Sequence, residues 1–411
     1  MIDTTLLRDN PQKIAQAAKD KRIELNTEHI AHIDAEYRKV LVDVQTLRES
    51  RNRFAKDRDI EAGKRIKGEL DQKEKALEAL KQELDTLLLT IPNPAKDDVK
   101  VGKDDTENDV IRTYKSPKEF AFPVKDHLEI GEYLNMIDME RAAKVSGARF
   151  VYLKNDGVLL ELALIQFALK TLMKEGFTPV ITPDLIKKET MQGLGYMENG
   201  GDEDMFQIPS DDLVLVGTAE HALVPMHKDE VLDAKTFPLR YAGFSNAYRR
   251  EAGSYGKDTR GILRVHQFDK VEMVSFVKKG EDDAEHEYLL SLEENFFKAL
   301  DIPFQVIKMC TGDLGFPAAR KYDIEAWMPS QKKYREVTSV STVTDFQSRR
   351  LKIRYRDGDT TEYAMILNGT AFAIGRTLIA ILENYQQEDG SVVVPEVLRE
   401  YVGKDVLTPL K

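Results

Sequence analysis

The sequence predicts an α+β protein with two parts, an N-terminal antiparallel two-helix coiled-coil arm and a larger domain whose antiparallel sheet is flanked by helices. Apolar residues recur at heptad spacing in the first 91 residues, whereas short alternating strands with tight turns dominate the second half of the chain. The length of 411 residues allows two or three domains, and 42% hydrophobic with 32% charged residues is typical of a globular protein.

The arm is predicted from two runs of heptad-spaced residues, 30–54 and 66–91, in which the steps alternate between three and four. Arg51 occupies one seam position of the first run, which weakens the apolar contact there. A short polar segment containing Gly63 separates the runs, so we expect two helices to fold back on each other over about residues 28–91. Each helix would be about 37 Å long at about 1.5 Å per residue.

Three segments are expected along the chain: a helical arm over 1–100, a polar, turn-rich linker over 101–119, and the main domain over 120–411. In the main domain, Asp357-Gly358 lies between two alternating runs and predicts a hairpin. Antiparallel pairing of this kind argues against a Rossmann fold. The sequence has no G-x-x-x-x-G-K-[ST] motif, so a nucleotide would be bound by other means.

Charge and composition exclude several classes of protein. The formal net charge of −11 argues against binding nucleic acid over the whole surface. A single cysteine, Cys310, excludes an internal disulfide and a cysteine-rich zinc site. The longest apolar stretch, 158–173, is interrupted by Glu161, Gln166 and Lys170 and predicts an amphipathic helix, not a membrane span. We expect a cytoplasmic protein with no membrane contact and no zinc.

Basic residues gather near the tip of the predicted arm, interleaved with five acidic ones. Such a run can be a solvated helix face or a contact with nucleic acid, and the sequence leaves both open. The basic residues are Arg48, Arg51, Arg53, Lys56, Arg58, Lys64, Arg65 and Lys67.

A second charged cluster lies in the segment 244–273, which is predicted as strand, loop and strand. In the second strand, alternate residues share one face, namely Arg264, His266, Phe268, Lys270 and Glu272. Arg249 and Glu251 share a face of the first strand. This surface is either a solvated face with ion pairs or a polyanion site, with arginines on phosphate and Phe268 against a nucleobase. We expect His266 to be structural and not a catalytic base.

Two further fragments fit an anion or metal site. Glu336 and Ser339 offer a carboxylate and a hydroxyl, which are hard oxygen ligands suited to magnesium. Arg376 is predicted at the start of a helix, next to the positive end of its dipole, where a bound anion would account for it.

Several segments together resemble seryl-tRNA synthetases of bacterial type, which are class II aminoacyl-tRNA synthetases, over nearly the whole chain. The N-terminal MIDTTLLRDNP and the hairpin resemble the family's tRNA-binding arm. The family's three class II motifs are matched by GFTPVITPDLI, by YRREAGSYGKDTRG with RVHQFDKVEM, and by NGTAFAIGRTLIAILENYQQEDGSVVVPEVL. The triplet TAE at residues 218–220 also matches.

The resemblance implies a role for each matching residue. An ATP site would comprise Arg249, Arg250, Glu251, Arg264, Val265, Phe268, Glu336, Val337, Thr338, Ser339 and Arg376. A serine site would comprise Thr218, Ala219, Glu220, Arg249, Glu272 and Thr370. Glu336 and Ser339 would bind Mg²⁺, and Arg249, Arg376 and Glu336 would carry the chemical step. The basic residues of the arm would contact tRNA.

The implied activity is activation of L-serine with ATP, followed by transfer of the seryl group to tRNA(Ser), with tRNA(Sec) as a second candidate. Motif 1 implies a homodimer. One rival is an amino-acid ligase that loads a carrier protein, but the resemblance implies that such relatives lack the arm. Another rival is a non-catalytic binding protein. The retention of Arg249, Arg376 and Glu272 counts against it.

Overall fold

The structure, a computed structural model, describes residues 2–57, 59–252 and 260–409 and divides into two compact units, Met1–Pro94 and Ala95–Lys411. Two parts of the sequence prediction lie outside the described residues: Arg58 of the basic cluster, and residues 253–259 of the loop between the two charged strands. Each unit is described by itself below.

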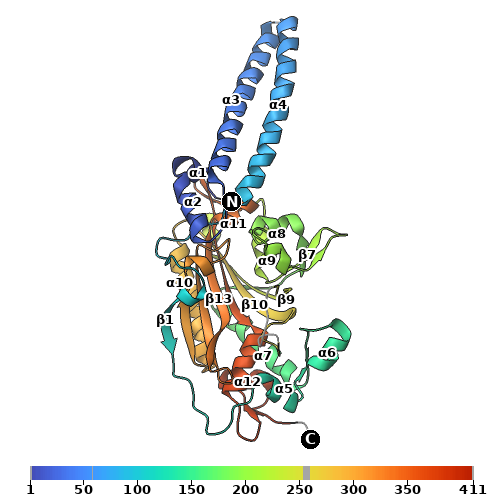
Figure 1. Ribbon diagram of the computed structural model, residues 1–411, viewed down its shortest axis with the longest axis vertical. Helices are drawn as coiled ribbons and strands as arrows, with labels where there is room; N and C mark the ends of the chain where they lie inside the picture. Colours follow the sequence, from blue (N-terminus) through green and yellow to red (C-terminus); the bar gives the residue numbers. More distant parts are fainter. Residues whose placement is uncertain (1, 58, 253–259, 410–411) are drawn as a thin grey trace. The chain divides into compact units, whose positions relative to one another are not determined.

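The described part of Met1–Pro94 is helical (Figure 1), with helices α1 (Thr4–Asp9), α2 (Pro11–Asp20), α3 (Thr27–Asp57) and α4 (Ile60–Leu89). The predicted two-helix arm is confirmed, since α3 and α4 run side by side in opposite directions. Seam residues such as Ile30, Val44, Leu70 and Leu84 are buried between them. Arg51, in contrast, is exposed.

The arm differs from the prediction at its tip. The segment expected to form a polar loop is almost wholly helical, and Gly63 lies inside α4. Asp59 caps α4 by accepting a hydrogen bond of 3.0 Å from the backbone N–H of Ala62. A good cap and neighbouring strong helix formers offset the roughly 1 kcal/mol that an interior glycine costs.

The base of the arm is fixed by a buried ion-pair cluster. Asp34 is 1% exposed and accepts hydrogen bonds from Arg8 Nε at 2.9 Å and Arg8 Nη2 at 2.7 Å. Arg38, one turn further along α3, adds a third at 2.9 Å. Hydrogen bonding from Arg8 lowers the pKa of Asp34 despite its burial. The cluster therefore ties α1 to α3.

The unit Ala95–Lys411 is built on an eight-stranded sheet in the order β1-β11-β12-β13-β16-β10-β9-β4. These strands are β1 (Asp109–Tyr114), β4 (Thr178–Ile181), β9 (Leu239–Tyr248), β10 (Gln267–Val277), β11 (Phe304–Lys308), β12 (Arg320–Met328), β13 (Lys333–Thr344) and β16 (Met365–Ala373). Neighbours pair antiparallel except β4 with β9. The antiparallel sheet expected from the sequence is thus confirmed.

Long helices cover one face of this sheet and form the core with it (Figure 1): α7 (Asp156–Lys174), α10 (Asp282–Ala299) and α12 (Ile374–Asn384). Phe167 of α7 and Phe296 of α10 meet edge to face, with ring centroids 5.6 Å apart. Val271 and Met273 of β10 are fully buried in the same cluster. By the two-residue period, Lys270 and Glu272 point to the opposite face.

The remaining elements are short. The helices are α5 (His127–Tyr133), α6 (Met139–Ser146), α8 (Lys188–Leu194), α9 (Glu220–Leu223), α11 (Phe346–Leu351) and α13 (Arg399–Val402). The strands of the small sheets are β2 (Ile137–Asp138), β3 (Tyr152–Leu153), β5 (Leu185–Lys187), β6 (Gln207–Ile208), β7 (Leu213–Leu215), β8 (Val231–Asp233), β14 (Arg354–Asp357), β15 (Thr360–Tyr363), β17 (Val392–Val393) and β18 (Val406–Leu407). The expected hairpin at Asp357-Gly358 joins β14 to β15, with Gly358 at a φ of +59°.

Two further observations bear on the sequence expectations. The segment 101–119, expected to be a linker, contains β1, which pairs with β11 at the edge of the main sheet. Val110, Ile111 and Thr113 give this acidic segment enough β-branched residues to pair. Among the helices of the described residues, none is both long enough and apolar enough to cross a membrane.

Candidate active site

A cavity of about 530 Å³ opens over the face of the sheet that α7 and α10 do not cover. It brings together thirteen residues of the predicted ATP and serine sites, which the sequence spreads over more than 150 positions. They are Thr218, Glu220, Arg249, Glu251, Val265, Phe268, Glu272, Glu336, Val337, Thr338, Ser339, Thr370 and Arg376.

Strand register explains why these residues converge. Glu272 of β10 lies opposite Thr370 of β16 and opposite Gly243 of β9. Gly243 is required for close packing, because a Cβ atom there would lie 2.8 Å from the Cβ of Ala219. Ala219, fully buried, therefore brings the start of α9 against β9 and places Glu220 in the cavity.

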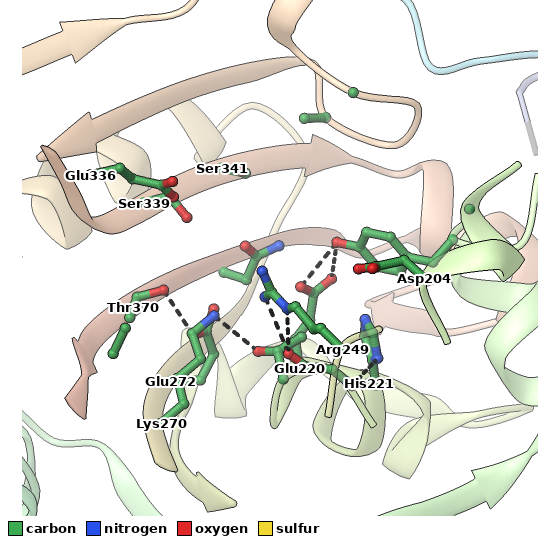
Figure 2. Close-up of a pocket in the computed structure, with 18 of the residues that line it drawn as sticks. Asp204, Glu220, His221, Arg249, Lys270, Glu272, Glu336, Ser339, Ser341 and Thr370 are labelled. Atoms are coloured by element: carbon green, nitrogen blue, oxygen red, sulfur yellow. Dashed lines mark hydrogen bonds and ion pairs between the residues drawn. The ribbon is translucent and has the colours of Figure 1, made fainter. Parts of the chain in front are cut away.

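One end of the cavity holds a buried ion pair (Figure 2). Glu272 is 1% exposed, and its Oε2 lies 2.7 Å from the Nζ of Lys270. The hydroxyl of Thr370 donates to the same oxygen at 3.1 Å, and Lys270 also donates to Thr218 Oγ1 at 3.2 Å. Because both charges are buried, each depends on the other for stability. The result is a compact array of hydroxyl, ammonium and carboxylate groups.

A second buried carboxyl, Glu220, has different neighbours. It accepts hydrogen bonds from the hydroxyl of Tyr196 at 3.0 and 3.1 Å and from Gln347 Nε2 at 2.9 Å. Burial raises the pKa of Glu220 to about 7, and the negative charge of Glu272 adds to this effect. Glu220 thus changes its charge near neutral pH.

Beside it, His221 accepts a hydrogen bond of 3.1 Å at Nδ1 from the backbone N–H of Gly217. Burial, with the charge of Arg249 nearby, lowers the pKa of His221 to about 3. The imidazole is therefore neutral at physiological pH, so it adds no positive charge to the cavity.

Arg249 follows directly on β9 and is held from several sides (Figure 2). Its Nε and Nη2 each donate to the carbonyl oxygen of Gly217 at 3.2 Å. Its guanidinium lies 5.5 Å from the ring centroid of Phe268. His266 Nδ1 donates to the Arg249 carbonyl at 2.9 Å, which gives this histidine a backbone partner. The arginine is thereby oriented with donors to spare for an anion.

The other end of the cavity pairs Arg376 with Glu336. Arg376, in the first turn of α12, donates from Nη1 to Glu336 Oε2 at 2.8 Å. Burial would raise the pKa of Glu336, yet the charges of Arg376 and Lys321 outweigh it and hold this pKa at about 2. The carboxylate is therefore ionised throughout the physiological range.

Glu336 and Ser339 lie together on β13 (Figure 2). An ionised carboxylate and a hydroxyl fit Mg²⁺, which prefers hard oxygen ligands and commonly keeps water or phosphate ligands as well. In the described part of the chain, no group of three or more His, Cys, Asp or Glu side chains could bind a metal. A magnesium ion here would accordingly take much of its coordination from substrate and water.

Three predicted site residues have other surroundings. Arg250 is exposed, with its guanidinium 5.7 Å from the ring centroid of Phe206. Arg264 donates to Glu251 at 3.1 Å, and so is linked to the cavity through a residue that lines it. Ala219 packs below the cavity as described above. The described basic residues of the arm are all exposed on α3 and α4, where Arg48 pairs with Glu74 and Lys64 with Glu61.

Sequence reasoning missed three residues that line the cavity, Tyr196, His221 and Lys321. It also missed Gln347, which hydrogen-bonds Glu220. Lys270 was placed on the correct strand face by its period but was assigned no role. His221 directly follows the TAE triplet, so its position offered a signal. Tyr196 and Gln347 lie in segments without a diagnostic spacing.

An antiparallel sheet with Arg249 at a strand end and Arg376 at a helix start is the arrangement that the resemblance to class II tRNA synthetases implies. In agreement, the family model "tRNA synthetase class II core domain (G, H, P, S and T)" matches residues 205–385, which contain the residues of both cavity ends. The model "Seryl-tRNA synthetase N-terminal domain" matches residues 1–95. The chain belongs to the serine–tRNA ligase family, as its resemblance predicted.

Full-length relatives agree. The chain is 46% identical to serine–tRNA ligase of Thermobifida fusca and 47% identical to that of Acidothermus cellulolyticus, each over 100% of this chain and 99–100% of the relative. Seryl-tRNA synthetase of Pyrococcus horikoshii, complexed with ATP, superposes with a TM-score of 0.94 at 39% identity, with 100% of both chains covered. Cytoplasmic serine–tRNA ligase of Naegleria fowleri, in complex with AMP, gives 0.90 at 29% identity, covering 100% of this chain and 99% of that one.

Proposed function

We propose that this protein activates L-serine with ATP to form seryl-adenylate and then transfers the seryl group to the 3′ end of tRNA(Ser). One observation carries the proposal: Arg249 and Arg376 line the same cavity as the buried Glu272, Lys270 and Thr370 network. The relatives named serine–tRNA ligase support it, as does the neighbour whose structure contains ATP.

In the first step, the carboxylate of serine attacks the α-phosphorus of ATP, and pyrophosphate leaves. Arg249 contacts the α-phosphate and the serine carboxylate, Arg376 binds the γ-phosphate, and Phe268 stacks on adenine. Glu251, Arg264 and Val265 complete the nucleotide site, with Val337 and Thr338 on the neighbouring strand. No protein nucleophile is needed, because positioning and charge neutralisation lower the barrier.

In the second step, a hydroxyl of the terminal ribose of the tRNA attacks the seryl carbonyl, and AMP leaves. Serine is held by its ammonium group at Glu220 and by its hydroxyl at Glu272 and Thr370, with Thr218 beside them. A site that hydrogen-bonds a hydroxyl strongly rejects an analogue without one, so alanine is excluded.

Glu336 and Ser339 would hold Mg²⁺, which when bound supplies positive charge to neutralise the phosphates of ATP. Arg376 donates a hydrogen bond to the same carboxylate at 2.8 Å, so it orients Glu336 as well as binding the γ-phosphate. Glu336, with its pKa held at about 2, is ready to bind a cation without first losing a proton.

A homodimer is the second part of the proposal. β4 is an edge strand of the main sheet, and α7 packs beside it. Ile181 of β4 is 82% exposed, and Leu159 and Leu162 of α7 are 40% and 47% exposed. A second copy that pairs about a two-fold axis would cover this apolar edge.

The arm, residues 1–100, serves as the tRNA-binding part, with 101–119 joining it to the catalytic domain 120–411. The exposed basic residues near the tip of α3 and α4 supply phosphate contacts. We place the protein in the cytoplasm, where its substrate tRNA occurs. tRNA(Sec) remains the second candidate acceptor.

The test is ATP–pyrophosphate exchange measured with each of the twenty amino acids, followed by charging of tRNA. We expect exchange with serine alone and esterification of tRNA(Ser). Serine-dependent exchange without tRNA charging would favour a ligase that loads a carrier protein, and no exchange with any amino acid would favour a non-catalytic binding protein.

A further inference from the structure

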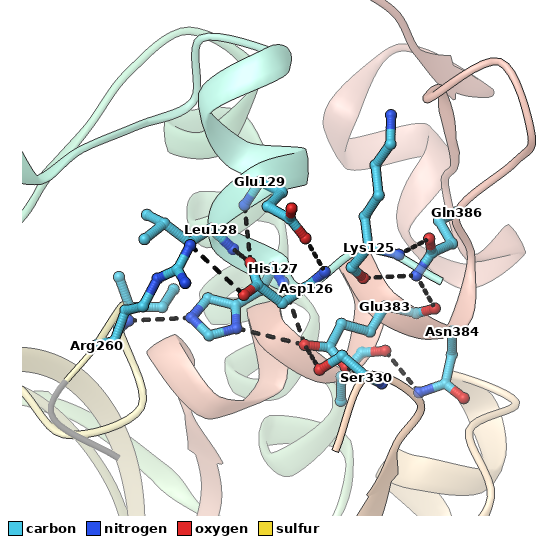
Figure 3. Close-up of polar contacts among 12 residues, drawn as sticks. Lys125, Asp126, His127, Leu128, Glu129, Arg260, Ser330, Glu383, Asn384 and Gln386 are labelled. Atoms are coloured by element: carbon cyan, nitrogen blue, oxygen red, sulfur yellow. Dashed lines mark hydrogen bonds and ion pairs between the residues drawn. The ribbon is translucent and has the colours of Figure 1, made fainter. Parts of the chain in front are cut away.

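A buried histidine outside the cavity connects two parts of the chain that line the cavity wall, the segment that begins at residue 260 and helix α12 (Figure 3). His127, at the start of α5, is 6% exposed. Its Nε2 accepts a hydrogen bond of 3.2 Å from the backbone N–H of Ile262, and its Nδ1 lies 3.4 Å from Glu383 Oε1. The imidazole thus bridges the segment after the strand loop and the C-terminal end of α12.

Glu383 is fully buried and is itself held by backbone groups. It accepts hydrogen bonds from the N–H of His127 at 3.1 Å and the N–H of Ser330 at 3.0 Å. The hydroxyl of Ser330 adds a third bond at 2.8 Å. Because these three bonds are shorter than the contact to Nδ1, they determine where the carboxylate lies.

The donors around the imidazole define its tautomer. The N–H of Ile262 can only donate, so Nε2 must carry a lone pair. The ring proton is therefore on Nδ1, where it points at the Glu383 carboxylate. Loss of this acceptor would allow the other tautomer, whose Nε2–H would oppose the N–H of Ile262.

The backbone at residues 261–262 is tightly enclosed. Gly261 has a φ of +77°, and a Cβ atom there would lie 2.1 Å from His127 Nε2. On the other side, a Cβ atom at Gly375 would lie 3.2 Å from the carbonyl oxygen of Ile262. Ile262 is thus held between the imidazole and the first turn of α12, the turn that carries Arg376.

This enclosure bears directly on the cavity. Ile262, Leu263 and Val265 line it together with Gly375 and Arg376. Helix α12 therefore supplies Arg376 in its first turn. At its other end it supplies Glu383, whose carboxylate orients His127. The ion pair of Arg260 with Asp126 also joins the segment that begins at residue 260 to the start of α5, but at 3.8 Å it is longer than the bond from Ile262 to His127, and it is more exposed.

We propose that His127, oriented by Glu383, is a positioning residue that sets the Ile262–Val265 wall of the nucleotide end of the cavity. The inference rests on the proposed function, since it assigns ATP to that end. Loss of the Nε2 acceptor frees the N–H of Ile262 and lets the wall move relative to Arg376. ATP binding is weakened, whereas the serine end, built on Glu272 and Thr370, is unaffected.

Two substitutions separate this role from simple packing. The amide oxygen of His127→Gln reaches the position of Nε2 and can accept from Ile262, whereas the shorter amide of His127→Asn reaches only the position of Nδ1. We expect the KM for ATP in serine-dependent exchange to rise about tenfold in His127→Asn, as for the loss of one buried hydrogen-bond acceptor. In His127→Gln it stays within about twofold, and the KM for serine stays within about twofold in both variants.

Equal ATP KM values in the Gln and Asn variants, or a parallel rise of both KM values, would overturn the inference. If neither variant folds, as judged by thermal unfolding, Glu383→Leu provides the second measurement, because leucine has no acceptor for the Nδ1 proton. The KM for ATP should rise without a change in the KM for serine, and an unchanged KM for ATP would overturn the inference. A wild-type chain without serine-dependent exchange would count against the proposed function instead.

Discussion

Two carboxyl groups in one cavity have opposite protonation behaviour because of their immediate partners. Glu336 lies beside two cations, which hold its pKa at about 2 despite burial. Glu220 is surrounded by the neutral donors Tyr196 and Gln347, so burial dominates and raises its pKa to about 7. Glu336 therefore suits a permanent cation site, whereas Glu220 suits a ligand whose binding depends on pH.

The first prediction concerns Glu220 and pH. Its pKa is raised from 4.5 to about 7, so the carboxyl is increasingly protonated as pH falls below 7. In the proposed site, serine's ammonium group binds the ionised form of Glu220, so kcat/KM for serine should fall about tenfold per pH unit below 7. Pyrophosphate exchange between pH 5.5 and 8.5 measures this, with the KM for ATP as internal control. A flat serine profile in that range contradicts the assignment, and Glu220→Gln should show low serine affinity at every pH.

The second prediction concerns Arg249. In the proposed mechanism the guanidinium of Arg249 faces the developing charge, so serine-dependent exchange should fall by about 10³-fold or more in Arg249→Ala. Arg249→Lys keeps the charge but loses the planar fork, and should recover only part of this loss. Arg356→Ala, which removes an exposed arginine on β14, is the matched control. Near-normal exchange in Arg249→Ala would remove Arg249 from the site.

Single residues could be predicted where they obey a local period. Phe268, Lys270 and Glu272 share a strand face, and the period of two alone places them together. Tyr196, in the segment after α8, and Gln347, in α11, reach Glu220 from 24 and 127 residues away. A contact of that kind depends on tertiary packing, which no pattern in one segment encodes.

At the scale of elements, the heptads predicted the arm because its core is formed within one hairpin. The prediction failed at the tip, where an Asp cap extends α4 over a segment that looked like a loop. Within the expected linker 101–119, the six residues of β1 form a strand by pairing with the edge of β11, which composition alone does not indicate. Edge strands depend on their partner more than on their own composition.

The third prediction shortens the arm. Asp43 and Lys73 form an ion pair of 2.6 Å across the hairpin, so a short glycine-serine turn can replace residues 44–72 between them. The buried cluster of Asp34, Arg8 and Arg38 at the base is retained. Exchange should be unchanged, whereas kcat/KM for charging tRNA should fall by about 10²-fold or more, because the basic tip is lost.

Steady-state charging and exchange assays on the same preparation check this prediction. The variant with residues 28–91 deleted should give the same two results as the shortened arm, unchanged exchange and reduced charging. It also loses the ion-pair cluster at the base of the arm, so the shortened arm is the more specific test. If the shortened arm charges tRNA at the wild-type rate, the tip has no part in tRNA binding.

For the whole molecule, the distribution of charge matters more than its sum. The net charge of −11 repels a polyanion, yet residues 48–69 contain eight basic and five acidic side chains. The charged side chains of this segment that the structure describes are exposed. Arg48 and Lys64 form ion pairs at the surface, which are weak, so both side chains can exchange their partners for phosphate. Attraction confined to one region and repulsion elsewhere would favour a single orientation of bound tRNA.

The fourth prediction tests whether that localised charge is what binds tRNA. Each phosphate contact releases counterions, so the dissociation constant should rise steeply with salt, with a slope of about 0.7–0.9 per contact on logarithmic axes. Neutralising Arg51 and Arg53 to Gln should lower this slope by about 1.4–1.8, if each contacts one phosphate. Lys39→Gln with Lys75→Gln removes the same charge outside the tip, and should leave the slope unchanged. Equal slopes in both double variants would mean that net charge, and not the arm tip, governs binding.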